Sequence, residues 1–170
     1  MNKTKMSTFV RVAMIAAIYT VISLVLAPFS FGNIQVRIAE ALTILPLFYK
    51  PSIYGVTLGC FLTNLLGAML GVNPTGLIDA VIGTLATFLA AECTYYLKEK
   101  LIHGVPVWSI LMPVVFNFLF VGTELAVLFF EGSLFLGIVI MGTEVAIGEL
   151  ISVIVGYFLS KALAKRNLFA

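Results

Sequence analysis

Seven ionisable residues lie within apolar stretches of this sequence, where a charged side chain is costly. They are Arg37, Glu40, Asp79, Glu92, Glu124, Glu144 and Glu149. In a hydrocarbon environment such residues usually face the interior of a helix bundle or a water-filled cavity. An ionised carboxylate can accept two parallel N–H donors, so this set predicts recognition chemistry for a ligand with a guanidine-like edge.

Amides and aromatic rings accompany these carboxylates. Asn117 and Glu124 are seven residues apart and therefore share one face of a helix, with Phe116 and Phe120 beside that face. Asn64 lies in another apolar stretch. A ring can cover the face of a flat ligand while carboxylates and amides bind its edge. We therefore expect a pocket for a flat heterocycle that carries hydrogen-bond donors and, optionally, a positive charge.

Structural roles are the alternative for several of the ionisable residues. Arg37 and Glu40 are three apart on one helical face and could form a local ion pair that anchors a loop. Glu92 is near the end of its apolar stretch, where its carboxylate can reach water. Glu144 could be a neutral, hydrogen-bonded side chain. It lies about 140° from Glu149 around a helix, so the two cannot enter one narrow site.

The composition predicts a membrane protein. Of the 170 residues, 61% are hydrophobic and only 11% are charged. Soluble domains are about 45–50% apolar and about 25% charged. A water-soluble fold of this composition would expose large apolar patches. The net charge of +2, with basic residues in short clusters, offers no continuous basic stripe for nucleic acid.

Six apolar segments approach the roughly 20 residues that a spanning helix needs. They cover residues 9–27, 37–49, 52–70, 76–97, 107–130 and 134–163. We expect an all-α fold, in which residues 1–170 form a single bundle of six transmembrane helices. The first segment resembles a signal peptide, but we expect it to be retained because no small-residue cleavage site follows it.

The second segment is short and contains Pro46. Irregular backbone at membrane depth is tolerated only against protein or a water-filled cavity. We therefore expect residues 29–34, which precede this segment, to dip toward the membrane and cover a pocket on the outer side.

The basic residues predict the orientation. With six spans, nine of the ten lysines and arginines lie on the side of both termini, and only Arg37 lies on the other side. Loops rich in lysine and arginine usually face the cytoplasm. We therefore expect both termini to be cytoplasmic.

Small residues at four-residue spacing predict close helix packing. In lipid the hydrophobic effect does not drive helices together, so close contact between them takes its place. The first segment carries Ala13 and Ala17, with Ala16 and Thr20 beside them; this patch packs inside the bundle or docks another membrane protein. The longer ridges are Gly55, Gly59, Thr63, Gly67 and Gly71 in the third segment, and Gly148, Ser152, Gly156 and Ser160 in the sixth.

Common catalytic motifs are missing from the sequence. No G-x-x-x-x-G-K-[ST] stretch is present to hold ATP phosphates, and no H-E-x-x-H pair is present to bind zinc. The single histidine, His103, lies in a predicted loop. We expect a protein that is not an enzyme, with no cofactor and no metal.

Four stretches closely resemble the QueT family. Residues 30–48 read SFGNIQVRIAEALTILPLF, residues 59–67 read GCFLTNLLG, residues 76–91 read GLIDAVIGTLATFLAA, and residues 148–153 read GELISV. The resemblance implies a substrate-binding (S) component of an energy-coupling factor (ECF) transporter in the bacterial cell membrane. It implies uptake of a queuosine precursor, a deazaguanine base, with a transmembrane coupling subunit and two cytoplasmic ATPase subunits as partners.

The resemblance also implies site residues. Those matched for substrate binding are Arg37, Glu40, Asn64, Asp79, Asn117, Glu124 and Glu149. Ala13 and Ala17 match the pattern by which S components dock the coupling subunit, whereas Glu144 does not match the family pattern. The alternatives are an S component for another vitamin such as thiamine, an intramembrane enzyme that acts on a lipid or peptide, and a structural scaffold.

Overall fold

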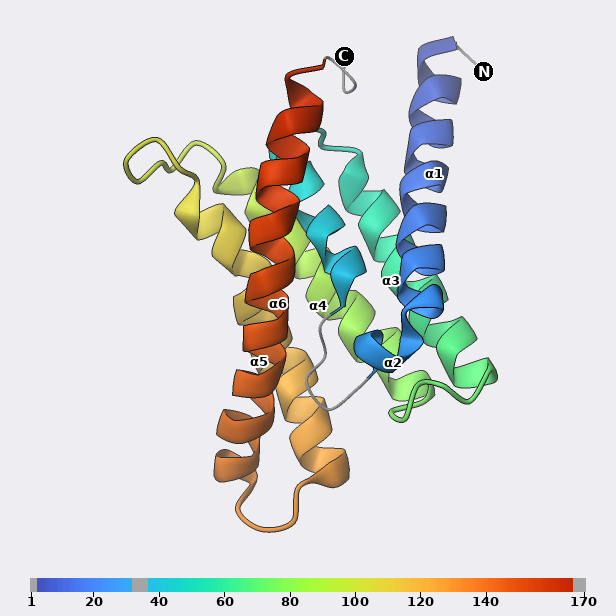
Figure 1. The fold of residues 1–170 in the computed structure, drawn as a ribbon, viewed down its shortest axis with the longest axis vertical. Coiled ribbons are helices and arrows are strands. Elements are labelled where there is room, and N and C mark those ends of the chain that lie inside the picture. The colour runs from blue at the N-terminus through green and yellow to red at the C-terminus, as the bar shows by residue number, and fades with distance from the viewer. Residues whose placement is uncertain (1–2, 32–36, 167–170) are drawn as a thin grey trace.

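The computed structural model describes residues 3–31 and 37–166, and helices dominate that part of the chain (Figure 1). In chain order the elements are α1 (Lys3–Val25), α2 (Ala27–Ser30), the 3₁₀ helix η1 (Ile38–Leu47), α3 (Ser52–Met69), α4 (Leu77–Tyr96), α5 (Val107–Phe129) and α6 (Leu134–Ala164). Between the helices, the described residues hold one isolated β-bridge, which joins Ile102 to Val105.

Five of these helices, α1, α3, α4, α5 and α6, are long and apolar enough to cross a membrane. The prediction of an all-α membrane bundle is thus confirmed at this level. The predicted second span is the exception, because η1 has ten residues and is apolar but short. At about 2.0 Å per residue it covers roughly 20 Å, which is less than a hydrocarbon core of about 30 Å. The sixth crossing stays a prediction.

Two side chains explain why this segment departs from an α-helix. Pro46 lies inside η1 and supplies no backbone N–H. The Thr43 hydroxyl donates a hydrogen bond to the Glu40 carbonyl at 2.6 Å, which competes with regular helix pairing. A compact 3₁₀ helix follows from both.

The short helix η1 occupies the centre of the bundle. It contacts each of the five long helices, and Figure 1 shows it enclosed among them. Most of its side chains are buried, including Glu40 and Ile44. The segment that is too short to span the membrane therefore organises the core.

Helices α1 and α3 approach each other through small residues, as predicted. A side chain at Gly55 would collide with Ile15, and one at Gly59 would collide with Tyr19. The Thr20 hydroxyl donates to the Gly59 carbonyl at 3.2 Å. This side of α1 is consequently fixed against α3.

Helix α6 uses glycines in the same way. Gly156 leaves no room for a Cβ because the Ala41 carbonyl of η1 lies against it. On α5, a Cβ at Gly122 would come within 2.5 Å of the Gly142 Cα. Gly71, predicted as part of the α3 ridge, instead follows the end of that helix with a φ of +71°. That left-handed backbone suits glycine as a helix stop.

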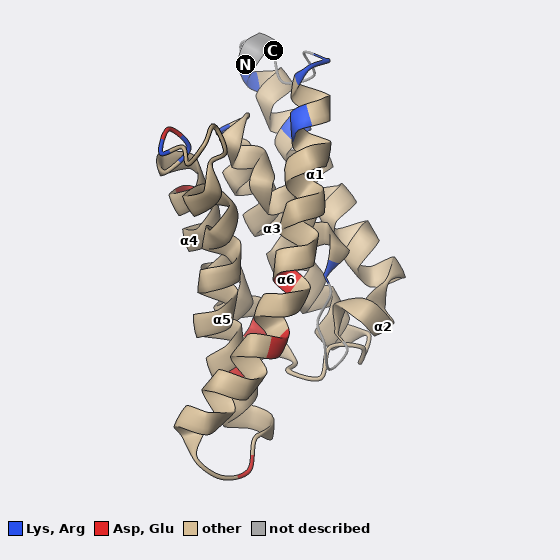
Figure 2. Cartoon of the chain, turned by 60° about the vertical axis from the view of Figure 1, so that its left-hand side comes forward, with Lys and Arg blue, Asp and Glu red and all other residues tan. Residues whose placement is uncertain are grey.

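The described basic residues gather at one end of the bundle. The first turns of α1 and the last turns of α6 lie at the same end (Figure 1), and lysine and arginine segments cluster there in Figure 2. Arg37 is the exception, since it pairs with Asp79 in the first turn of α4, away from the lysine-bearing connection that follows α4. The charge segregation agrees with the predicted topology, while the cytoplasmic placement of the termini remains a prediction.

Candidate ligand-binding site

Arg37 forms the centre of a buried polar cluster. It directly precedes η1, and its Nη2 lies 3.2 Å from Asp79 Oδ2. Its Nη1 lies 3.9 Å from Glu40 Oε1, and its guanidinium covers the Phe31 ring at 5.4 Å. Asp79 is in the first turn of α4, where the helix dipole favours a carboxylate. These contacts tie the start of η1 to the start of α4.

Two amides complete the surroundings of Asp79. Asn64 on α3 donates from Nδ2 to the Asp79 carbonyl at 2.9 Å, and Asn73 donates to Asp79 Oδ2 at 3.3 Å. Thr75 in turn holds the Asn73 side-chain oxygen through its N–H and its hydroxyl. A side chain at Gly83 would overlap Asp79 Oδ1, so glycine there lets the carboxylate lie against α4.

The structure adds Tyr19, Asn73 and Gly83 to the predicted residues. The Tyr19 hydroxyl donates to Glu40 Oε1, and Tyr19 is fully buried on α1. The sequence signal for Asn73 is its position in the polar turn just before α4. Tyr19 carries no comparable signal, because a tyrosine in an apolar helix is common in any bundle.

Asn117 of α5 and Glu149 of α6 face the same cluster from the other side. A small cavity brings them together with Arg37 and Glu40, and its lining is Arg37, Glu40, Asn117, Val121, Val145 and Glu149. The space open to the centre of a water molecule is about 10 Å³, which is room for about one water.

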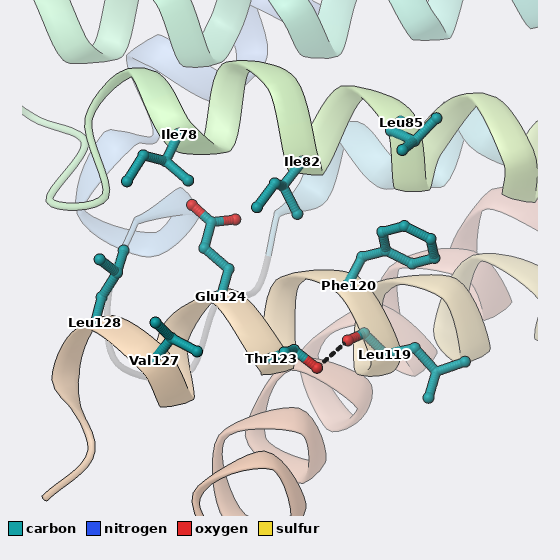
Figure 3. Close-up of a pocket in the computed structure, with 9 residues that line it drawn as sticks. All are labelled: Ile78, Ile82, Leu85, Leu119, Phe120, Thr123, Glu124, Val127 and Leu128. Carbon is teal, nitrogen blue, oxygen red and sulfur yellow. Dashed lines mark hydrogen bonds between the residues drawn. The ribbon is translucent and has the colours of Figure 1, made fainter. Parts of the chain in front are cut away.

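Glu124 lies one helical turn beyond Val121 on α5 and lines a separate, larger groove between α4 and α5 (Figure 3). This groove has a volume of about 510 Å³. Its lining is Ile78, Ile82, Leu85, Leu119, Phe120, Thr123, Glu124, Val127 and Leu128. Thr123 donates its hydroxyl to the Leu119 carbonyl, so Glu124 provides the polar group that remains for a ligand.

The cluster and the groove hold many buried polar atoms without a hydrogen-bond partner. Among the described residues the unpaired acceptors are Glu40 Oε2, Asn64 Oδ1, Asp79 Oδ1, Glu149 Oε1 and both carboxylate oxygens of Glu124, and the unpaired donors are Arg37 Nε and Asn117 Nδ2. Buried polar groups in proteins are normally paired. Three carboxyl groups, those of Glu40, Asp79 and Glu149, thus lie around the Arg37 guanidinium, and Glu124 adds a fourth in the adjoining groove, with acceptors available for a ligand rich in N–H donors.

The predicted site residues are therefore distributed over two adjoining places. Arg37, Glu40, Asn64 and Asp79 are joined by direct contacts, and Asn117 and Glu149 meet Arg37 and Glu40 across the small cavity. Glu124 lies in the adjoining groove. Glu144 is half-buried and lines neither the small cavity nor the groove. It is also the acidic residue that does not match the family pattern.

The small patch on α1 divides between two faces. Ala16 and Thr20 are buried against α3, whereas Ala13 and Ala17 are exposed. Of the predicted pocket cover at 29–34, residues up to Ser30 belong to α2, and residues 32–34 lie outside the described part of the chain. No group of three or more metal-ligating side chains occurs within the described residues.

Comparison with known proteins shows what this membrane bundle is. A family model described as "QueT transporter" matches residues 9–165. The chain belongs to the QueT transporter family. This QueT-family chain is thus a multi-pass membrane protein, and the prediction that it is not an enzyme is confirmed by the class of its family, which is described as transporters.

One curated relative is the "Queuosine precursor transporter QueT" of Lactococcus lactis subsp. cremoris (strain MG1363). It is 32% identical over 91 residues, which make up 52% of this chain and 50% of the relative. The matched region thus spans about half the length of the curated relative. No solved structure matches the chain.

Proposed function

We propose that this chain is the substrate-binding component of an ECF-type importer for a queuosine precursor. In this proposal a deazaguanine base enters from the outer side, and both termini are cytoplasmic. A transmembrane coupling subunit and two ATPase subunits then drive its release into the cytoplasm. The named relative and the family match support the transported class. The sequence has no phosphate-binding loop of its own, which fits a division of labour with ATPase partners.

The observation that carries the proposal is the excess of unpaired buried acceptors around Arg37. A guanine-like edge presents parallel N–H donors, and a carboxylate accepts such a pair in a bidentate manner. Glu149 Oε1 and Asn117 Nδ2 have no hydrogen-bond partner in the described part of the chain, and both residues line the same cavity. We assign the N–H edge to Glu149, the base carbonyl to Asn117, and an ammonium substituent to Glu124.

The described conformation is too closed for a bicyclic base, since its cavity holds about one water molecule. Asn117 and Glu149 belong to α5 and α6, whereas Arg37 and Glu40 belong to η1 and the residue before it. We propose that α5 and α6 move away from η1 when the base binds. Such a motion would couple ligand binding to the arrangement of the helices, because η1 contacts all five long helices.

Docking of the coupling subunit is assigned to the exposed face of α1. Ala13 and Ala17 are one turn apart and exposed, while the opposite face of α1 is fixed on α3 through Thr20 and Gly59. Small residues at this spacing allow another helix to approach closely within a membrane.

Ligand binding by the purified protein in nanodiscs tests the proposal. Isothermal titration with an aminomethyl-deazaguanine, guanine and thiamine is expected to give the tightest binding for the deazaguanine. Tighter binding of thiamine would assign the chain to another vitamin. The absence of heat and of thermal stabilisation with every deazaguanine would overturn the queuosine-precursor assignment.

A further inference from the structure

The geometry points to a second part of the ligand site: the groove between α4 and α5 takes a carbon substituent on an ammonium nitrogen that is bound by Glu124. This inference rests on the proposed function, because the base of the same ligand occupies the cluster around Arg37. It extends the substrate class from a primary aminomethyl-deazaguanine to precursors whose amino group carries an apolar group.

Glu124 is a buried carboxylate that has no hydrogen-bond partner among the described residues. Only 4% of its surface is exposed, and both of its carboxylate oxygens are unpaired within residues 3–31 and 37–166. In Figure 3 its side chain rises from α5 toward α4, and the carboxylate lies between Ile78 and Ile82. A buried carboxylate of this kind calls for a charged donor, since its desolvation is otherwise uncompensated.

The groove around this carboxylate is apolar and larger than an ammonium group needs. Its volume is about 510 Å³. Aliphatic side chains of α4, namely Ile78, Ile82 and Leu85, form one wall. A substituted ammonium matches both features, because its nitrogen can pair with Glu124 while its carbon atoms lie against the aliphatic wall.

Helices α4 and α5 contribute residues both to the groove and to the Arg37 cluster, which is the basis for one ligand that reaches both. Asn117, Val121 and Glu124 follow each other on one face of α5 at spacings of four and three residues. Ile78 of the groove directly precedes Asp79 of the cluster.

A lipid acyl chain is the competing occupant, because several groove residues are exposed on the outer surface of the bundle, including Leu119 and Val127. An acyl chain would fill the apolar walls, yet it has no donor for Glu124. Charge complementarity therefore favours the substituted ammonium.

The test compares three compounds on the full-length protein in nanodiscs by isothermal titration. They are an aminomethyl-deazaguanine, its N-cyclopentyl derivative, and its N-carboxyethyl derivative. The N-cyclopentyl compound is expected to bind within about threefold of the parent, since its added carbons leave water for an apolar wall. The N-carboxyethyl compound is expected to bind at least about tenfold more weakly, because its carboxylate would enter an apolar groove beside Glu124.

Groove-filling variants provide the second arm. Ile82→Trp is expected to raise the ratio of the N-cyclopentyl Kd to the parent Kd by at least about tenfold, since a filled pocket discriminates sharply between ligands that differ by a few carbons. Ile151→Trp is the matched control, because Ile151 is an exposed residue of α6 away from the groove; it should leave the ratio unchanged. Leu128→Trp repeats the test at another wall position if Ile82→Trp does not fold.

The outcomes separate the two proposals. If the wild-type protein binds the parent compound but does not bind the N-cyclopentyl compound, the inference is overturned and the proposed function stands. An unchanged Kd ratio in both groove variants would assign the groove to lipid and also overturn it. Failure of the parent compound itself would remove the proposed function and this extension together.

Discussion

Arg37 and Asp79 form a buried ion pair, with 3.2 Å between Nη2 and Oδ2, across 42 positions of the sequence. The pair joins the residue before η1 to the first turn of α4. Farther along η1, the carbonyl of Ala41 lies against Gly156 of α6. The central short helix is thus held on two sides, and a ligand that contacts Arg37 also contacts the element around which the bundle is built.

Asp79→Asn is expected to lower the free energy of unfolding by about 3–5 kcal/mol, the range for removing one partner of a buried ion pair. The longer contact to Glu40, at 3.9 Å, would then be the remaining ion pair of Arg37 among the described residues. Thermal denaturation in detergent measures the change. Glu99→Gln, at an exposed residue between α4 and α5, is the control and should leave the melting temperature unchanged. Equal melting temperatures for the two variants would show that the pair contributes little.

Glu124→Gln is expected to weaken binding of an aminomethyl-deazaguanine by about 1–3 kcal/mol, the range for a buried hydrogen bond to a charged group. The Gln side chain fits the same space as Glu, but its neutral amide cannot balance the positive charge of the ligand's ammonium group. Titration calorimetry measures the affinity, with Glu144→Gln as a matched control because Glu144 lines neither the cavity nor the groove. Unchanged affinity for the Glu124 variant would remove that residue from the site.

Ala17→Trp is expected to abolish uptake while ligand binding is retained. The substitution adds bulk to the exposed face of α1, where the coupling subunit is proposed to dock, and Ala17 lies outside the binding cluster. Radiolabelled uptake in cells that express the whole transporter is compared with titration of the purified chain. Val81→Trp, at an exposed position of α4, is the control and should preserve uptake. Loss of binding in the Ala17 variant would contradict the docking role.

Gly156→Ala is expected to destabilise the fold by about 1–3 kcal/mol, the usual range for added bulk in a well-packed core. The new methyl group would overlap the Ala41 carbonyl and push η1 away from α6. Val155→Ala tests the same helix at a residue that is 55% exposed and should have a much smaller effect. Thermal denaturation compares the two, and similar melting temperatures would mean that η1 can shift without cost.

Helix bounds and membrane class could be predicted from the sequence because hydropathy is a local property. The segment predicted at 52–70 corresponds to α3, Ser52–Met69, and the segment predicted at 107–130 corresponds to α5, Val107–Phe129. The first segment begins earlier than the expected residue 9, at Lys3, because its polar first turns continue the helix without adding to its hydropathy.

The types of the site residues were also set by the sequence alone. Carboxylates and an arginine in apolar segments had to find partners or a ligand wherever the helices placed them, because an unpaired charge in hydrocarbon is too costly. The pairing of Arg37 with Glu40 could be predicted from their spacing, whereas the pairing of Arg37 with Asp79 could not, since no local pattern connects residues so far apart.

Only the tertiary structure decided which of these side chains lie in the Arg37 cluster, which lie in the groove, and which face outward. It put Tyr19 on Glu40, assigned Glu124 to a groove of its own, and turned Ala13 and Ala17 outward while Ala16 faces α3. The physical reason is that the rotation of each helix about its axis is set by close contacts with its neighbours, such as those at Gly59 and Gly156. Hydropathy in a nearly uniformly apolar helix carries little information about that rotation.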